Sequence, residues 1–259
     1  MLSAVNSIKQ VAPRFGGTYT STNETSGILD LSVLLVDGRT LKYRLVLKQV
    51  GKQLSAREEY PTHLPAFCPE RHINSDGTFC LYYPAADRLE VYDEASAISW
   101  METLYKYLKL QDRATRQRKW PSTSFWAHGD AALHQLKALD AASELSLDIT
   151  NAVKNDRTIL KRRTSKGRPI LEVWVENTRV FSVWEHCKKV INQSRRCFCQ
   201  SSRTRKPKKI RRCNDHAKQA VILAFAIRDW QVEEQKFWDC LNDKYCCGTC
   251  DNCPLPLKT

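Results

Sequence analysis

The sequence lacks any apolar stretch approaching the roughly 20 consecutive residues that a membrane helix needs. Its first 15 residues mix polar and apolar types without a long apolar segment, so we expect no secretory signal. No internal repeat is evident. These absences favour a cytoplasmic protein without a membrane partner, and 259 residues suffice for one large domain or two ordinary ones.

Acidic residues are scarce in the C-terminal part of the chain. Residues 1–150 hold 17 Lys and Arg against 17 Asp and Glu, whereas residues 151–259 hold 24 against 11. The whole formal net charge of +13 therefore belongs to the second part. Such a split indicates two regions with different tasks. We predict one domain over residues 1–148 and a second over 149–259.

Cysteine is scarce in the first part. Only Cys68 and Cys80 lie there, whereas nine of the eleven cysteines lie between Cys187 and Cys253. An odd number without an export signal argues against a disulfide framework. In a reducing cytosol, clustered cysteines are typical of metal ligands, and a further one can be a nucleophile. We take Cys68, between Phe67 and Pro69, as structural.

The hydrophobic pattern changes from a period of two to a helical period along the chain. Residues 28–36 and 40–50 predict two strands joined by an Asp37-Gly38 hairpin turn. Residues 53–90 are expected to be mostly irregular. The other expected elements are helices over 1–12, 95–118, 130–147 and 217–241, and strand-like runs over 158–162 and 171–184.

Cys80 follows directly on an Asp76-Gly77 turn and the pair Thr78-Phe79. A nucleophilic cysteine needs partial exposure and nearby backbone donors, and such a turn supplies a sharp bend with free N–H groups. The plainer alternative is a buried cysteine that acts as a small hydrophobic residue.

The stretch around Cys80 resembles the active-site segment of ubiquitin-conjugating (E2) enzymes. Tyr60-Pro61 and Pro65 match the approach to that segment. The positions that then fall on the pattern Ile-x-x-x-Gly-x-Ile-Cys-Leu are Ile73, Gly77, Phe79, Cys80 and Leu81. The resemblance implies an α+β fold over residues 1–148, a UBC-like antiparallel β-meander with flanking helices. It also implies that Cys80 carries a ubiquitin-like protein as a thioester.

The sequence departs from this family where His-Pro-Asn is replaced by Glu70-Arg71-His72. His72 stands in place of the asparagine and can donate a hydrogen bond to an oxyanion or act as a base near neutral pH. A surface turn is the alternative. With Trp126-Ala127-His128-Gly129, this departure resembles bacterial E2-like proteins of anti-phage operons. Those occur beside a ubiquitin-like protein, an E1-like enzyme and a JAB-type peptidase, and some carry an appended cysteine-rich region.

The resemblance implies an acyl-transfer mechanism. An E1-like partner passes the ubiquitin-like protein to Cys80, and His72 stabilises the oxyanion that develops when a target protein attacks the thioester. His128 or Asp130, in the loop after the long helix, orients or deprotonates the attacking amine or hydroxyl. For His128, a role at the N-terminal cap of the next helix, with Trp126 packed beside it, is equally plausible.

Two groups of cysteines have the spacing of zinc ligands. The first contains Cys197, Cys199, Cys213 and His216. The second contains Cys247, Cys250 and Cys253, with Cys246, Cys240 or Cys187 as the fourth ligand. Its Cys-Gly-x-Cys-Asp-x-Cys run resembles the zinc-binding subdomain of RecQ-type helicases, which supports zinc and not helicase activity. We therefore expect one or two structural Zn²⁺ ions in a small cysteine-rich domain; free or redox-active thiols are the alternative.

A basic run extends from Ser194 to Arg212. Such a run can be a solvated loop, a contact for nucleic acid, or a contact for an acidic protein, because charge alone names no partner. An alternative function therefore stays open: a zinc-containing adaptor that binds nucleic acid or protein, in which the E2-like half is a docking module without activity. An inactive scaffold for a partner ligase is a third reading.

Overall fold

The computed structural model of the chain describes residues 4–87, 89–121, 126–191, 195–199 and 209–257. The chain forms two compact units. Unit 1 consists of Met1–Ser122 together with Leu241–Thr259, and unit 2 consists of Thr123–Cys240. The boundary predicted at residue 148 falls inside unit 2. The last residues of the predicted cysteine-rich domain belong to unit 1 because they contact the N-terminal part of the chain.

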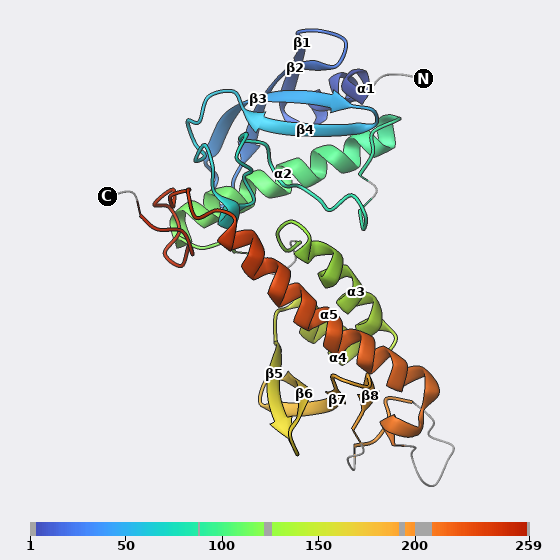
Figure 1. Cartoon of the computed structure of the whole chain (residues 1–259). Helices are drawn as coiled ribbons and strands as arrows, with labels where there is room; N and C mark the ends of the chain where they lie inside the picture. The colour runs from blue at the N-terminus through green and yellow to red at the C-terminus, as the bar shows by residue number, and fades with distance from the viewer. Residues whose placement is uncertain (1–3, 88, 122–125, 192–194, 200–208, 258–259) are drawn as a thin grey trace. The chain divides into compact units, whose positions relative to one another are not determined.

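Unit 1 contains a four-stranded antiparallel meander in which neighbouring strands follow one another in the chain (Figure 1). Its strands are β1 (Gly17–Ser21), β2 (Ser26–Leu34), β3 (Thr40–Val50) and β4 (Gln53–Glu58). Alternate side chains such as Leu29 and Leu31 in β2 and Leu45 and Leu47 in β3 are buried. The predicted α+β fold with an antiparallel meander is confirmed.

Two helices pack with this sheet. Helix α1 (Ala4–Val11) contacts α2 (Glu94–Gln117), β3 and β4. Asp93 caps α2 by accepting the N–H of Ser96 at 2.8 Å, while the Ser96 hydroxyl accepts the N–H of Asp93. The buried face of α2 includes Trp100, Leu104 and Leu108, which lie four residues apart and so share one side of the helix.

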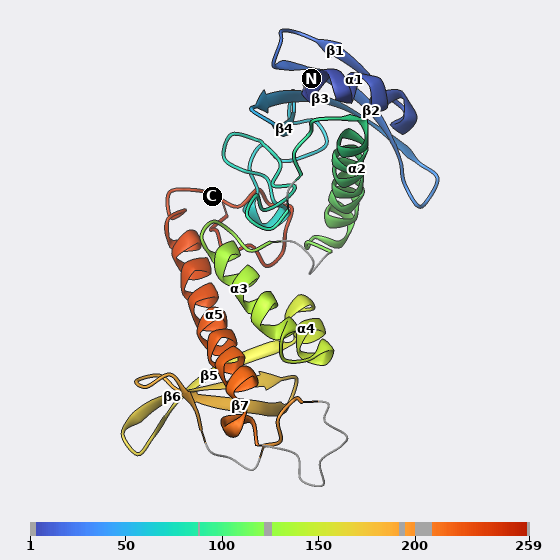
Figure 2. The same ribbon diagram turned by 90° about the vertical axis from the view of Figure 1, so that its right-hand side faces the viewer.

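Unit 2 combines three helices with a second antiparallel sheet. The helices are α3 (Ala131–Ser143), α4 (Leu147–Lys154) and α5 (Asn214–Asp239). The strands, in sheet order, are β5 (Thr158–Ser165), β6 (Arg168–Val175), β7 (Thr178–Trp184) and β8 (Lys189–Val190). Helices α3 and α5 lie side by side, and the sheet packs near one end of α5 (Figure 2).

One hydrophobic core holds unit 2 together. Leu171 and Phe181 from the sheet, Leu223 and Ile227 from α5, and Ile149 from α4 all contribute buried side chains. The helix predicted over residues 130–147 corresponds to α3, which ends at Ser143. A separate helix, α4, begins at Leu147, where Ser146 caps it by accepting the N–H of Ile149. Among the helices in the described ranges, none is long and apolar enough to cross a membrane.

Candidate active site and metal centres

A tight turn delivers Cys80 to the surface of unit 1. Gly77 has a φ of 80°, which an L-residue rarely adopts, and its N–H donates to the carbonyl of Asn74 at 2.9 Å. The N–H of Phe79 donates to the carbonyl of Ala56 in β4 at 2.8 Å. The thiol that follows is partly exposed. The sheet therefore holds the turn, and the turn places Cys80.

Cys80 and His72, predicted to act together, belong to one loop, the Cys80 loop (residues 68–81). The N–H of Cys80 donates to the carbonyl of His72 at 2.8 Å. His72 follows a 3-10 turn (Pro69–Arg71) and has a φ of 55°, and its N–H donates to the carbonyl of Pro69. Its buried imidazole packs edge-on against Trp120, with ring centres 5.0 Å apart. Backbone hydrogen bonds thus fix the spacing of the two residues.

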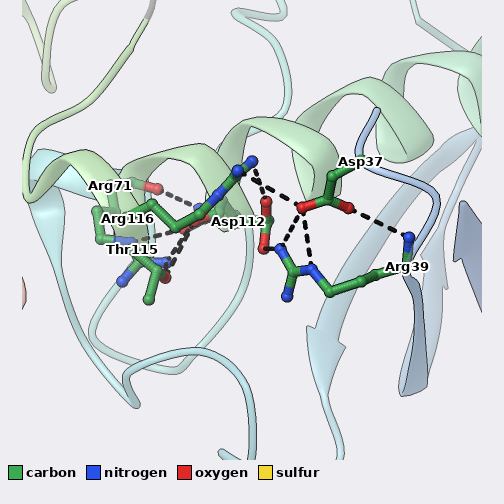
Figure 3. A network of polar contacts seen from close by, with 7 residues as sticks. Asp37, Arg39, Arg71, Asp112, Thr115 and Arg116 are labelled. Carbon is green, nitrogen blue, oxygen red and sulfur yellow. Dashed lines mark hydrogen bonds and ion pairs between the residues drawn. The ribbon is translucent and has the colours of Figure 1, made fainter. Parts of the chain in front are cut away.

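Hydrogen bonds from helix α2 hold the Cys80 loop in place. The hydroxyl of Tyr107 donates to the carbonyl of His72 at 3.0 Å. Arg71 is almost fully buried and donates to the side chain of Gln111 at 2.8 Å and to the hydroxyl of Thr115 at 2.9 Å (Figure 3). Gln111 in turn donates to the carbonyl of Arg71 at 2.7 Å. Sequence reasoning missed this anchor, since Arg71 appeared only as a departure from a motif.

The same helix carries an ion-pair network beside Arg71. Asp112 is buried and accepts from Arg39 at 3.1 Å and from Arg116 at 2.6 Å (Figure 3). Asp37, in the β2–β3 turn, also pairs with Arg39 at 2.9 Å. The two cations offset the buried carboxylate, which links the hairpin turn to α2 next to the Cys80 loop.

Burial raises the pKa of the Cys80 thiol above its ordinary value. The thiol is therefore mostly protonated at neutral pH.

Alkylation of Cys80 by iodoacetamide is expected to show a pH midpoint above the value of about 8.5 for a free cysteine. A raised pKa leaves less thiolate at pH 8, so the rate keeps rising beyond pH 9. Mass spectrometry of the Cys80 peptide measures the rate, with an unstructured cysteine peptide as the reference. Burial also slows alkylation at every pH, so the absolute rate does not report the pKa. The pH at which the rate is half-maximal does report it. A midpoint at or below that of the reference peptide would contradict the raised pKa.

His128 is held by α5 within unit 2. Its Nδ1 lies 2.5 Å from Oε1 of Glu234, and its backbone N–H donates to Oε2 of the same carboxylate at 3.0 Å. Its ring stacks on Phe237 with centres 4.6 Å apart. Burial alone raises the pKa of Glu234, but the His128 contacts outweigh it and hold that pKa below its ordinary value. Asp130, by contrast, is exposed at the start of α3 and makes no side-chain cap.

The first predicted metal group converges in unit 2. We call Cys197, Cys199, Cys213 and His216 the Cys3His group, and their ligand atoms all lie within 4.8 Å of one another. The Sγ of Cys199 is 3.5 Å from that of Cys197 and 3.6 Å from that of Cys213. The Nδ1 of His216 is 3.3 Å from Sγ of Cys199 and 3.2 Å from Sγ of Cys213.

These spacings fit a tetrahedral metal ion. Zinc–sulfur and zinc–nitrogen bonds place ligand atoms about 3.8 Å apart for two sulfurs and about 3.6 Å for sulfur and nitrogen. Helix α5 contributes two of the ligands, because Cys213 is its N-cap and His216 lies one turn later. Burial alone raises the pKa of Cys213, but hydrogen bonds with His216, Cys197 and Cys199 bring it to about 6. The group can therefore hold a metal ion.

The second predicted group lies in the part of unit 1 after α5, which we call the C-terminal segment (residues 241–257). The thiols of Cys247 and Cys250 contact each other there, and so do those of Cys246 and Cys253. Cys187 and Cys240 are exposed and do not belong to the Cys3His group. The ligand role predicted for Cys240 stays a prediction. Residues 200–208 of the predicted basic run and its start at Ser194 lie outside the described residues.

Two family models match the chain. Residues 15–122 match the prokaryotic E2 domain, and residues 127–255 match the cysteine-rich domain C-terminal to the E2 domain. Searches among curated proteins and among solved structures gave no match. The fold and the order of the two matches define a prokaryotic E2-like protein. The chain belongs to those that carry the cysteine-rich C-terminal domain, as its motifs predicted.

Proposed function

We propose that the chain is an E2-like conjugating enzyme that carries a ubiquitin-like protein as a thioester on Cys80. The setting of Cys80 supports this most. It is a partly exposed thiol after the Gly77 turn, bonded through its backbone to His72, in a domain that matches prokaryotic E2 domains. The Cys80 thiolate attacks the thioester on an E1-like enzyme, whose own thiolate leaves. A target amine or hydroxyl then attacks the Cys80 thioester, and the Cys80 thiolate leaves.

A loading assay tests this function. The chain is incubated with a candidate E1-like enzyme, its ubiquitin-like protein and ATP, and the products are separated with and without reductant. A band at the summed mass of the two proteins that disappears with reductant supports the thioester. Absence of that band, with an E1-like enzyme shown to activate its own ubiquitin-like protein, would favour the docking-module alternative.

We assign His72 the role of oxyanion stabiliser. A donor that is already oriented towards developing charge needs no reorganisation during the reaction. The positive φ of His72, its contact with Trp120 and the hydrogen bond from Tyr107 to its carbonyl all restrict how it can move. We propose that the imidazole takes the role of the asparagine that this family uses, from a loop anchored by α2.

Replacing His72 by alanine is expected to slow discharge of the Cys80 thioester to free lysine about 10²–10³-fold, the usual effect of removing one oxyanion donor. Loading should slow less, because the E1-like partner contributes its own donors during that step. Single-turnover discharge and loading are measured separately. His63→Ala, an exposed histidine of the same unit, is the matched control. Equal slowing of both steps by His72→Ala would exclude the oxyanion role.

His128 and Asp130 are proposed to act on the attacking nucleophile. Glu234 supports this for His128, because a carboxylate bonded to Nδ1 orients an imidazole and favours the tautomer with a basic Nε2. The exposed carboxylate of Asp130, two residues later, is suited to orient a lysine amine. The contacts of His128 with Phe237 and Trp238 fit the plainer packing role equally well.

We propose Zn²⁺ as the ion of the Cys3His group. Three thiolates and one imidazole are a common structural zinc set, and four protein ligands leave no open position for catalysis. Zinc would stabilise the fold by joining the segment before α5 to the first turn of that helix. No step of the transfer reaction requires it.

The pathway follows from the resemblance to bacterial E2-like proteins. We propose that a ubiquitin-like protein, an E1-like enzyme and a target protein are the partners, in the cytoplasm, with a JAB-type peptidase in the same pathway. An anti-phage role is the biological setting that this architecture suggests. The family match to a prokaryotic E2 domain is what supports it.

A second function, binding of nucleic acid or an acidic protein, is favoured by one surface feature. Unit 2 has a groove lined by Lys188, Lys189, Arg211 and Lys218 around apolar side chains such as Val221. Four cations at one groove attract phosphates or carboxylates. Salt-dependent binding of single- or double-stranded nucleic acid, in a chain that fails the loading assay, would establish this alternative.

A further inference from the structure

A buried cysteine of the N-terminal half meets the C-terminal segment. The Sγ of Cys68 lies 4.0 Å from that of Cys250, and both residues are buried. The thiol of Cys247 lies near both and interacts with each of them, although these three sulfurs are less tightly grouped than the ligand atoms of the Cys3His group. Cys68 and Cys250 are 182 residues apart in the sequence. The fold nevertheless brings both thiols, and that of Cys247, into the same part of unit 1.

The sulfur spacing suits a shared metal ion. Two thiolates on one tetrahedral zinc are about 3.8 Å apart. A disulfide bond would require about 2.05 Å. The Cys68–Cys250 distance of 4.0 Å therefore matches the first geometry. It also resembles the sulfur distances of 3.5 and 3.6 Å within the Cys3His group.

Polar groups around these thiols would support such an ion. The hydroxyl of Thr249 lies 2.9 Å from Sγ of Cys247 and accepts from Nη1 of Arg71 at 3.0 Å. A hydroxyl in this position can pass a hydrogen bond on to a ligating thiolate. The guanidinium of Arg71 adds a buried positive charge, which offsets the negative charge of several thiolates.

Hydrogen bonds to the end of α2 fix the C-terminal segment in the same place. The N–H of Asp251 donates to the carbonyl of Arg118 at 2.8 Å. The guanidinium of Arg118 donates to the carbonyl of Gly248 at 3.1 Å and pairs with the carboxylate of Asp251. The approach of Cys250 to Cys68 thus rests on several independent contacts within unit 1.

We propose that Cys68, Cys247 and Cys250 are three ligands of a second structural Zn²⁺ ion. Either Cys253 or Cys246, which contact each other in the same segment, completes the site. The ion joins the end of the chain to the E2-like domain itself. This goes beyond the proposed conjugating activity, and zinc can be counted whether or not Cys80 forms a thioester.

The second ion has a consequence for the Cys80 loop. Cys68 is the first residue of that loop and pairs with Ile73 through two backbone hydrogen bonds of 3.2 and 3.0 Å. His72 lies between them. Arg71 bridges Thr249 on one side and Gln111 of α2 on the other. The zinc therefore fixes the strand-like pairing on which the position of His72 depends.

Zinc counting by elemental analysis of the full chain, purified under reducing conditions, tests the proposal. Wild-type protein is expected to hold two zinc ions per chain. Cys68→Ser and Cys213→Ser should each hold one, and the double variant none. Cys187→Ser, at an exposed cysteine, is the matched control and should keep two. Two ions retained by Cys68→Ser, or one ion in the wild type that Cys213→Ser removes, would overturn the proposal.

A measurement without variants covers the case in which Cys68→Ser does not fold. In wild-type protein loaded with ¹¹³Cd, scalar coupling between the metal and cysteine β protons identifies the ligands directly. Coupling from Cys68, Cys247 and Cys250 to one cadmium nucleus is expected. A cadmium nucleus coupled to Cys247 and Cys250 without Cys68, or a Cys68–Cys250 disulfide in non-reducing mass spectrometry, would refute the ligand role of Cys68.

Discussion

Cys80→Ala is expected to abolish the reductant-sensitive adduct, whereas Cys80→Ser should convert it into an adduct that survives reductant. Alanine offers no nucleophile. Serine places a hydroxyl at the same point of the turn, and acyl transfer to oxygen forms an ester that thiols do not readily cleave. Serine should load more slowly, because its hydroxyl holds its proton more strongly than a thiol does. The loading assay with and without reductant measures both outcomes.

The comparison is informative because neither change disturbs the loop. The anchors of Cys80 are backbone bonds, from its N–H to His72 and from Phe79 to Ala56, which both variants retain. Circular dichroism and thermal unfolding should therefore match the wild type. Cys187→Ala removes an exposed cysteine of unit 2 and should load normally. A reductant-sensitive adduct that persists in Cys80→Ala would place the thioester on another cysteine and refute the assignment.

The parts of the fold that follow from local pattern were predictable from sequence. The alternation of residues 40–50 corresponds to β3, and the helical period of 95–118 corresponds to α2. Strands β1 and β4 were missed. β1 is short and rich in Thr, Gly and Ser, and β4 is interrupted by charged and polar residues, so neither shows a clear apolar alternation. Both are stabilised by pairing with a neighbour, which is a tertiary effect.

The candidate sites were likewise predictable only where their residues lie close together in the sequence. The Cys3His group was predictable because two short pairs, Cys197 with Cys199 and Cys213 with His216, reveal themselves by spacing. The contact of Cys68 with Cys250 was not, since Cys68 has no partner nearby in sequence. Glu234, 106 residues from His128, was missed for the same reason. Only folding brings such distant residues together, and their contacts leave no periodic pattern in the sequence from which they could be predicted.

Loss of the metal ion from the Cys3His group is expected to lower the free energy of unfolding of unit 2 by several kcal/mol. Structural zinc binds zinc-finger peptides with about 10–16 kcal/mol of apparent free energy, and that binding is available only to the folded chain. The group joins Cys197 and Cys199, in the segment before α5, to the first turn of that helix, and this connection lies beside Ile210 in the core and Phe198 packed against it. Without the ion, this connection and the first turn of α5 lose their common anchor.

The variant Cys213→Ser distinguishes the effect of the metal ion on stability from the effect of the helix cap. Cys213 is the N-cap residue of α5 and makes no side-chain cap bond, whereas serine is among the preferred N-cap residues. If capping dominated, Cys213→Ser would leave stability unchanged or raise it. If the metal dominates, the denaturant midpoint falls, one zinc ion is lost, and chelator has little further effect on unit 2. His186→Ala, an exposed histidine of the same unit, is the matched control and should change neither quantity. An unchanged midpoint with full zinc content in Cys213→Ser would show that its thiol is not a ligand, and the helix cap would then be its whole role.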